Sequence, residues 1–288
     1  MLAIGNNNRM KLAVIITCHN RKAKTLACLQ RLFDLLPEAE VYLTDDDCTD
    51  GTSDEVHGRF PQVHVIPGNG HLYWSRGMYK AWSEALKKDY DDYLWLNDDV
   101  TLYDGFWDEL QWCRNWVGTD CIVSGLIENP EHTQVIYGGY TPDKQVLQPA
   151  ATPQEMFSMN GNVVLVPRAV VQKIGIIDSY YVHDLGDVDY SLTARAHGIK
   201  VVSTRKAIGE SEPNNPCRVR LWNASILQRF KKLNTPLGSP LDKNFHFRRK
   251  HYGIVHACAF CSYVILINLM PDWLVVKLWG ATYVDAEQ

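Results

Sequence analysis

The chain has 288 residues, of which 46 % are hydrophobic and 22 % charged, and its formal net charge is −4. This length suits one large domain, or one domain with an appendage. The weak negative charge excludes the basic face that a nucleic-acid partner requires, so we expect no nucleic-acid ligand. The eight cysteines are scattered, and several stand in apolar segments, which is typical of reduced thiols in a cytoplasmic protein.

Short apolar runs alternate with amphipathic segments over the first hundred residues. Runs rich in β-branched and aromatic residues predict buried strands, and apolar residues at helical spacing predict the helices between them. The expected strands are 12–17, 41–43, 63–66 and 93–96, with helices at 23–36 and 73–88. This alternation predicts an α/β fold with a Rossmann-like, mostly parallel central sheet flanked by helices.

After residue 105 the pattern is less regular. We expect strands at 121–126, 134–137, 163–166 and 199–203, and helices at 106–116, after Pro167, at 190–197 and at 223–232. From His251 to Pro271 there is no Asp, Glu, Lys or Arg. That length could span a bilayer, but its recurring polar residues favour a packed or membrane-surface helix. We therefore expect a catalytic domain at 1–215 and a helical C-terminal region at 216–288.

Polar side chains follow each predicted strand of the first half, at Asn20, Asp45, Asn69 and the run 97–99. Because the carboxyl ends of parallel strands meet at one edge of a sheet, we expect a polar crevice there. In that run Asp98 and Asp99 are adjacent carboxylates, which repel each other unless a positive charge lies between them. A divalent metal holding a phosphorylated ligand is the natural candidate. The alternative is an Asx-type turn in which Asn97 and Asp98 satisfy backbone donors.

A second acidic cluster, Asp184, Asp187 and Asp189, precedes the predicted helix at 190–197. Asp187 and Asp189 lie near the helix N-terminus, where a carboxylate stays ionised, and an ionised Asp in a pocket can take a proton from a hydroxyl. The alternative is that one of the three simply caps the helix. Neither GxGxxG nor GxxxxGK[ST] occurs, which counts against a dinucleotide or P-loop site.

Four motifs between about residues 10 and 210 resemble those of family 2 glycosyltransferases, inverting, nucleotide-sugar-dependent enzymes with the GT-A fold. The matching segments are Cys18-His19-Asn20-Arg21, the run 44–52 (TDDDCTDGT), Asn97-Asp98-Asp99, and the run 186–192 (GDVDYSL) with Arg195 and Gly198. They resemble, in that order, the base-binding opening, the V-D-D-G-S-T-D-G-T signature, the DxD motif and the E-D-x-D-x-x-L-R run. The run 70–78 (GHLYWSRGM) resembles a rhamnosyltransferase-like subgroup.

The resemblance implies a role for each matching residue. Asp187 would be the catalytic base, and Asp99 would ligate a divalent metal, Mn²⁺ or Mg²⁺. The implied donor-binding residues are Thr17, His19, Asn20, Asp45, Asn69, Trp74 and Asp98, and the implied acceptor or secondary residues are Tyr181, His183, Asp189 and Glu210. Glu210 stands where the family often has a metal-ligating His, and His246 or His251 could supply that ligand instead.

Three departures from the family pattern stand out: Asn97 replaces the first Asp of DxD, Gly186 replaces a Glu, and Trp74 stands where an Arg is usual.

The resemblance implies an inverting hexosyl- or deoxyhexosyltransferase that uses a nucleotide-sugar, UDP- or dTDP-linked. Its acceptor would be a hydroxyl of a glycan or lipid-linked molecule in polysaccharide biosynthesis. It would act in the cytoplasm or at the inner face of the cell membrane, with peripheral membrane association. The alternatives are a catalytically degenerate nucleotide-sugar-binding module, which the departures favour, and a nucleotidyltransferase, whose glycine- and lysine-rich N-terminal loop is missing.

Overall fold

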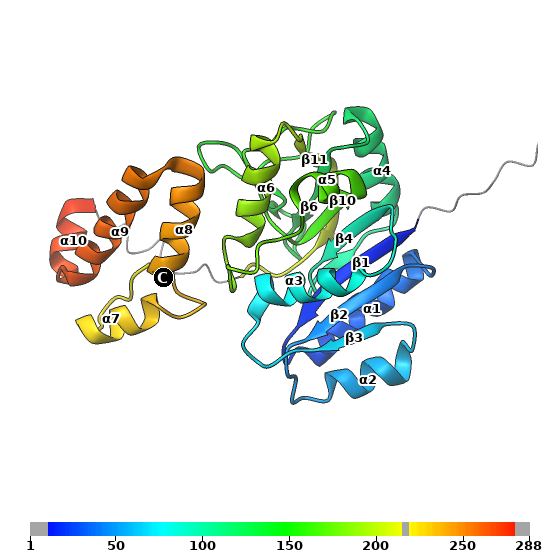
Figure 1. Cartoon of the computed structure of the whole chain (residues 1–288), viewed down its shortest axis with the longest axis horizontal. Helices are drawn as coiled ribbons and strands as arrows, with labels where there is room; N and C mark the ends of the chain where they lie inside the picture. Colours follow the sequence, from blue (N-terminus) through cyan, green and yellow to red (C-terminus); the bar gives the residue numbers. More distant parts are fainter. Residues whose placement is uncertain (1–10, 215–218, 280–288) are drawn as a thin grey trace, which may run out of the picture.

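The structure is a computed structural model that describes residues 11–214 and 219–279. Figure 1 shows a twisted central sheet covered by helices, with a group of C-terminal helices lying at one side of it. The boundary expected at residues 215 and 216 lies outside the described residues.

The main sheet is mixed. Its strands are β1 (Leu12–Cys18), β2 (Glu40–Asp45), β3 (His64–Pro67), β4 (Asp92–Leu96), β5 (Thr101–Leu102), β6 (Ile122–Glu128), β7 (Val135–Tyr137), β10 (Val163–Pro167) and β11 (Val201–Glu210). Their order is β3-β2-β1-β4-β10-β6-β11-β5, with β7 beside β6. The first four strands are parallel, as predicted. The expectation of a mostly parallel sheet is confirmed only in part beyond them: β6 and β11 are parallel, but β10 runs antiparallel to both β4 and β6.

Helices cover both faces of the sheet, and alternate residues of each strand point to opposite faces. One face is covered by α1 (Lys22–Leu35), α2 (Thr52–Arg59) and α4 (Phe106–Val117), and the other by α3 (Tyr73–Ala85), α5 (Arg168–Ile174) and α6 (Gly186–Ala196). In β1, Val14 and Ile16 belong to the first layer, while Ala13 and Ile15 belong to the second. All four side chains are fully buried, and each large one stabilises the fold by about 1.5–3 kcal/mol.

The C-terminal region is helical, as expected, with α7 (Ile226–Leu233), α8 (Leu241–Tyr252), α9 (Ile254–Leu269) and α10 (Asp272–Trp279). Gly253, with φ +87°, forms the sharp turn between α8 and α9. The guanidinium groups of Arg220 and Arg229 both bind the Asp272 carboxylate at the start of α10. Helix α8 packs against α6, so this region adjoins the domain beside its second acidic cluster (Figure 1). Among the described helices, none combines the length and the apolar character needed to cross a membrane.

Candidate active site

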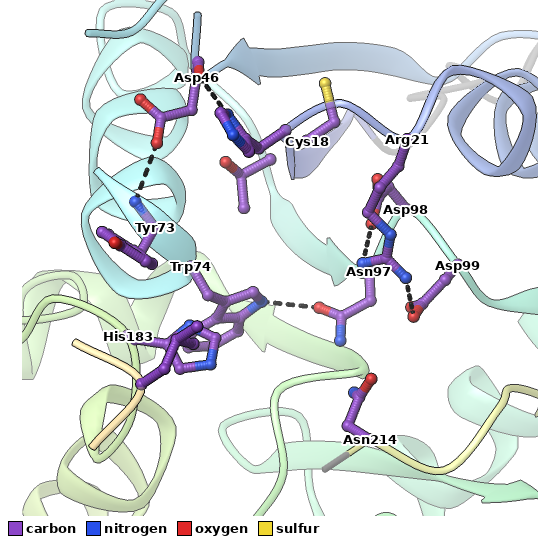
Figure 2. Close-up of a pocket in the computed structure, with 13 residues that line it drawn as sticks. Cys18, Arg21, Asp46, Tyr73, Trp74, Asn97, Asp98, Asp99, His183 and Asn214 are labelled. Carbon is purple, nitrogen blue, oxygen red and sulfur yellow. Dashed lines mark hydrogen bonds and ion pairs between the residues drawn. The ribbon is translucent and has the colours of Figure 1, made fainter. Parts of the chain in front are cut away.

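A cavity of about 340 Å³ lies where the strand order reverses, between the carboxyl ends of β1 and β4. Ligands of open α/β sheets bind at such switch points. Its lining residues are Thr17, Cys18, His19, Arg21, Asp46, Tyr73, Trp74, Asn97, Asp98, Asp99, His183, Asn214 and Leu237 (Figure 2). Six of the residues predicted for the site are among them, and they come from loops that are far apart in the sequence.

Asp46, which the sequence analysis did not single out, organises the loop that follows β3. Its carboxylate accepts backbone hydrogen bonds from Asn69 and Gly70 on one oxygen and from Leu72 and Tyr73 on the other, at 2.8–3.2 Å. Asp46 is 2 % exposed. The position of Trp74 at the cavity therefore depends on Asp46, because these bonds hold the chain just before it.

Three of the predicted donor residues lie outside the cavity lining. Asp45 is buried and accepts a 2.7 Å hydrogen bond from the amide of Cys48. Asn20 accepts one from the amide of Thr49, also at 2.7 Å. The side chain of Asn69 accepts from the amide of His71 at 3.0 Å, and thus belongs to the turn that Asp46 holds. All three stabilise loops at the rim of the cavity.

The positive charge between Asp98 and Asp99 is the guanidinium of Arg21. Its Nη1 donates to Oδ1 of Asp98 at 3.1 Å, and its Nη2 contacts Oδ2 of Asp99 (Figure 2). The hydroxyl of Thr25 donates to the other oxygen of Asp98 at 3.0 Å. Burial raises the pKa of Asp98 to about 6, although the charge of Arg21 opposes that rise. Sequence reasoning missed Arg21 because it stands 78 residues before Asp99.

Only one carboxylate of this group has an oxygen available to a metal. Both oxygens of Asp98 already accept hydrogen bonds, and the side chain of Asn97 accepts from Trp74 and donates to Asn162. Asp99 contacts Arg21 through Oδ2, and no described residue donates to its Oδ1. One carboxylate, completed by phosphate oxygens of a ligand and by water, is a common way for Mg²⁺ and similar ions to be held. The residues present therefore fit a metal that arrives with a diphosphate.

The other suggested metal ligands are engaged elsewhere. Glu210 accepts from the hydroxyl of Tyr103 at 3.1 Å and lies 3.4 Å from the ring of His132. His251 binds Asp189, and His246 lies against Tyr180. Within the described part of the chain, the one set of three metal-type ligand atoms close together is Cys18, Asp45 and Cys48, at the ends of β1 and β2 and in the loop after β2.

Trp74 connects the cavity to the second half of the chain. Its indole Nε1 donates to Oδ1 of Asn97 at 2.7 Å, and its ring lies against Gly161. A Cβ on Gly161 would come within 2.3 Å of that ring and 3.4 Å of the Cβ of Asp187. Gly161 precedes the antiparallel strand β10, so the reversed direction of β10 brings this glycine to the edge where β4 ends.

Asp187 lies in the first turn of α6. The predicted start of this helix at residue 190 is wrong, because α6 begins at Gly186 after Leu185, whose φ is +67°. The Asp187 carboxylate accepts hydrogen bonds from the amide of Gly161 at 2.9 Å and from that of Val188 at 2.8 Å. Burial raises the pKa of this carboxyl above its ordinary value, although the two amides oppose the rise. A raised pKa makes the ionised form a stronger base.

His183 and Asp184 bring two further polar groups next to Asp187. The Nδ1 atom of His183, which lines the cavity, is buried and has no hydrogen-bond partner among the described residues. Burial also lowers the pKa of His183, so its ring is neutral at pH 7. Burial, and next the charge of Asp187, raise the pKa of Asp184 to about 7. Sequence reasoning treated Asp184 only as a helix cap, since burial is not visible in the local pattern.

Asp189 and Tyr181, predicted as acceptor or secondary residues, connect the domain to α8. Asp189 accepts from the hydroxyl of Tyr181 at 2.8 Å, and lies 2.7 Å from both Nζ of Lys250 and the ring of His251. Burial alone would raise the pKa of Asp189, but these three partners lower it below the usual range. Helix α8 of the C-terminal region is thus attached to α6, the helix that carries Asp187.

The α/β fold, with its central mixed sheet covered by helices, is similar to that of GT-A glycosyltransferases. Residues 13–112, from β1 into α4, match the family model described as "Glycosyl transferase family 2". The match covers 100 of the 288 residues, and it ends before Asp187. No curated protein sequence matches the chain significantly.

Solved glycosyltransferase structures share the fold at low sequence identity. TarS 1-349 of S. aureus in complex with UDP-GlcNAc is 12 % identical with a TM-score of 0.55, over 89 % of this chain and 82 % of that one. The mannosyltransferase PcManGT of Pyrobaculum calidifontis, in complex with GDP-Man and Mn²⁺, is 11 % identical with a TM-score of 0.54. The match covers 96 % of this chain and 81 % of that one. GalNAc-T7 with UDP, GalNAc and Mn²⁺ is 13 % identical with a TM-score of 0.58. The match covers 73 % of this chain and 45 % of that one. The chain spans less than half of GalNAc-T7 and 37 % of a longer TarS structure.

Proposed function

We propose that the protein is an inverting glycosyltransferase that moves a sugar from a nucleotide-sugar to a hydroxyl of an acceptor. The observation that carries this proposal is the placement of Asp187. Its carboxylate is held by the amides of Gly161 and Val188, and Gly161 packs against the indole of Trp74, which lines the cavity containing Asp99. A base of raised pKa is thus connected, through Gly161 and Trp74, to a cavity suited to a metal-bound diphosphate.

Each side chain has a defined task in this proposal. Asp187 takes the proton from the acceptor hydroxyl, and the oxygen then attacks the anomeric carbon on the face opposite the nucleotide, so a single displacement inverts that centre. Asp99 would hold the divalent metal, which neutralises charge on the leaving diphosphate. Arg21 lies between the same carboxylates and can add a second positive charge there. The neutral ring of His183 offers its unpaired Nδ1 to a sugar hydroxyl.

The finer assignments continue from the sequence motifs. The donor would be a UDP- or dTDP-sugar, with its base at Thr17, His19 and the loops that Asn20 and Asp45 stabilise. The rhamnosyltransferase-like run at 70–78 favours a hexosyl or deoxyhexosyl donor and a role in polysaccharide biosynthesis on the cytoplasmic side. Complexes of the similar proteins with UDP-GlcNAc, GDP-Man and Mn²⁺ support a nucleotide-sugar and a divalent metal as ligands.

We also propose that the C-terminal helices bind a membrane surface from one side. Large apolar side chains are exposed on them, among them Leu227 and Val255 at 80 % and Trp273 at 66 %. Arg249, an exposed basic residue in the last turn of α8, would favour anionic lipids. Cosedimentation with phosphatidylcholine vesicles, with and without phosphatidylglycerol, tests this proposal. Val255→Ser should reduce binding, whereas Trp116→Ser, at an exposed tryptophan of α4, should not; equal binding of both variants would contradict it.

A donor screen tests the enzymatic proposal. UDP-, dTDP- and GDP-sugars are added to the full chain with Mn²⁺ or Mg²⁺, and melting temperature and nucleotide release are measured, because a bound ligand raises the apparent stability. One donor should stabilise the protein and be turned over. Tight binding of a donor without any turnover would favour the binding module instead, a role with which the engagement of Asn97 by Trp74 is consistent. Absence of both binding and turnover would refute both functions.

A further inference from the structure

A second groove, of about 510 Å³, lies between the domain and the C-terminal helices. Its walls come from the small ribbon of β8 (Gly139–Tyr140) and β9 (Ser158–Met159), from the first turn of α6, and from α8 and α9. The residues that matter for its chemistry are the aromatic Tyr140, Phe157, Phe247 and Tyr252 and the basic Lys144 and Arg248. The lining contains neither Asp nor Glu, although the whole chain carries a net negative charge.

The groove borders the turn that carries the proposed base. Leu185 and Val188, on either side of Asp187 in the sequence, both line it. Burial and the negative charge of Asp187 raise the pKa of Tyr140, which lines it as well. The donor cavity reaches the same turn through His183 and Trp74. The turn that carries Asp187 therefore lies between two separate hollows, as expected for a base that links a donor to an acceptor.

Arg248 gives the groove an unsatisfied positive charge. Its guanidinium lies 3.4 Å from the ring centre of Phe260, its Nε is buried without a hydrogen-bond partner, and no described carboxylate pairs with it. Burial lowers the pKa of Arg248, because keeping this cation away from water costs free energy. A guanidinium prefers to bind carboxylate or phosphate through paired hydrogen bonds. An anionic ligand would supply the negative partner that no described residue provides for Arg248.

We propose that this groove is the acceptor site and that it selects a glycan bearing an anionic group, a phosphate or a carboxylate. The sugar rings stack on Phe157 and Tyr252. The anionic group binds Arg248 and the exposed Lys144, and a hydroxyl of the same glycan reaches Asp187. The assignment as an acceptor site rests on the proposed glycosyltransferase function, whereas binding of an anionic glycan does not.

Binding of defined sugars to the full chain tests the proposal without turnover. The probes are a neutral disaccharide, the same disaccharide with a phosphate monoester, and the same disaccharide with a carboxylate in place of its primary alcohol, all titrated by NMR or calorimetry. At least one anionic probe should bind about tenfold more tightly than the neutral one. Arg248→Gln should abolish that preference, while Arg249→Gln, at the exposed neighbour on α8, should keep it. Which anionic probe binds more tightly distinguishes phosphate from carboxylate.

Two results would overturn the proposal: equal binding of neutral and anionic probes, or an unchanged preference in Arg248→Gln. Should Arg248→Gln fail to fold, as its melting curve would reveal, Tyr252→Ala serves as the second variant and should weaken all three probes because a stacking surface is lost. A donor titration on the same samples separates the two levels of inference. Selective binding of an anionic probe without binding of any nucleotide-sugar would refute the glycosyltransferase function but not the anionic groove.

Discussion

The backbone amide of Gly161 donates a 2.9 Å hydrogen bond to Oδ2 of Asp187. The two residues come from different elements, since Gly161 precedes β10 and Asp187 begins α6. The bond forms because β10 runs antiparallel to β4 and so starts at the edge where β4 ends. The position of the proposed base thus depends on the direction of a strand in the middle of the sheet.

Gly161→Ala should damage the site. A Cβ at this position would come within 2.3 Å of the indole of Trp74, which must then move away from Asn97. We expect a loss of about 1–3 kcal/mol in the free energy of unfolding and weaker donor binding, measured by denaturant titration and calorimetry. Gly58→Ala is the matched control, since its Cβ meets nothing within 4 Å in helix α2. It should stabilise the protein by about 0.5–1 kcal/mol. Unchanged stability and donor affinity in Gly161→Ala would contradict the packing described.

Asp184→Asn should make the protein more stable at alkaline pH. Burial and the charge of Asp187 raise the pKa of Asp184 to about 7 in the folded state, well above its value of about 4 in the unfolded chain. Between these pH values the folded protein binds more protons than the unfolded chain does. The free energy of unfolding of the wild type therefore falls as the pH rises. Melting temperatures should therefore coincide near pH 4, and the variant should melt higher above pH 7. Asp34→Asn, on the exposed side of α1, should show no such divergence.

Asp99→Asn should reduce the metal-dependent part of donor affinity. The Asp99 carboxylate offers the one open oxygen of the 97–99 run, and an amide oxygen is a weaker ligand for a hard cation. Calorimetry with Mn²⁺ and with EDTA should show a metal-dependent gain for the wild type that the variant loses. The loss should reach at least the ~10-fold that removal of an outer-shell metal partner typically costs. Asp104→Asn, at an exposed carboxylate paired with Arg31, should retain the gain. The same gain in Asp99→Asn would remove this residue from the metal site.

Asp189→Asn should loosen the attachment of the C-terminal helices. The carboxylate is 2 % exposed and binds Lys250 and His251 of α8. We expect a loss of about 1–3 kcal/mol at pH 7, discounted from a fully buried pair because the Lys250 side chain is 35 % exposed. Because the folded pKa of Asp189 is depressed, its contribution is present above about pH 4 and is lost as the pH falls through the folded pKa. Asp242→Asn, at an exposed carboxylate of α8, should have little effect. If the difference in unfolding free energy between the wild type and Asp189→Asn grew as the pH fell, the role of this ion pair would be contradicted.

The sequence predicted the parts of the fold that depend on local patterns. Apolar runs followed by polar residues located β1 to β4 and the edge where their loops meet. The direction of β10 could not be predicted, since a buried strand has the same pattern in either direction. The start of α6 was missed because Leu185, with its positive φ, replaces the usual Ser, Thr, Asp or Asn cap. Arg21 and His251 were missed as partners of the acidic clusters because only the tertiary fold brings them there.

Asp187→Asn tests the central claim most directly. Donor affinity and sugar transfer are measured on the same preparation, with the donor that the screen identifies. Loss of the proposed base should reduce kcat by about 10²–10⁴-fold and leave the donor Kd nearly unchanged, because the amide can keep a hydrogen bond from Gly161. Transfer at the wild-type rate would contradict the claim that Asp187 is the base.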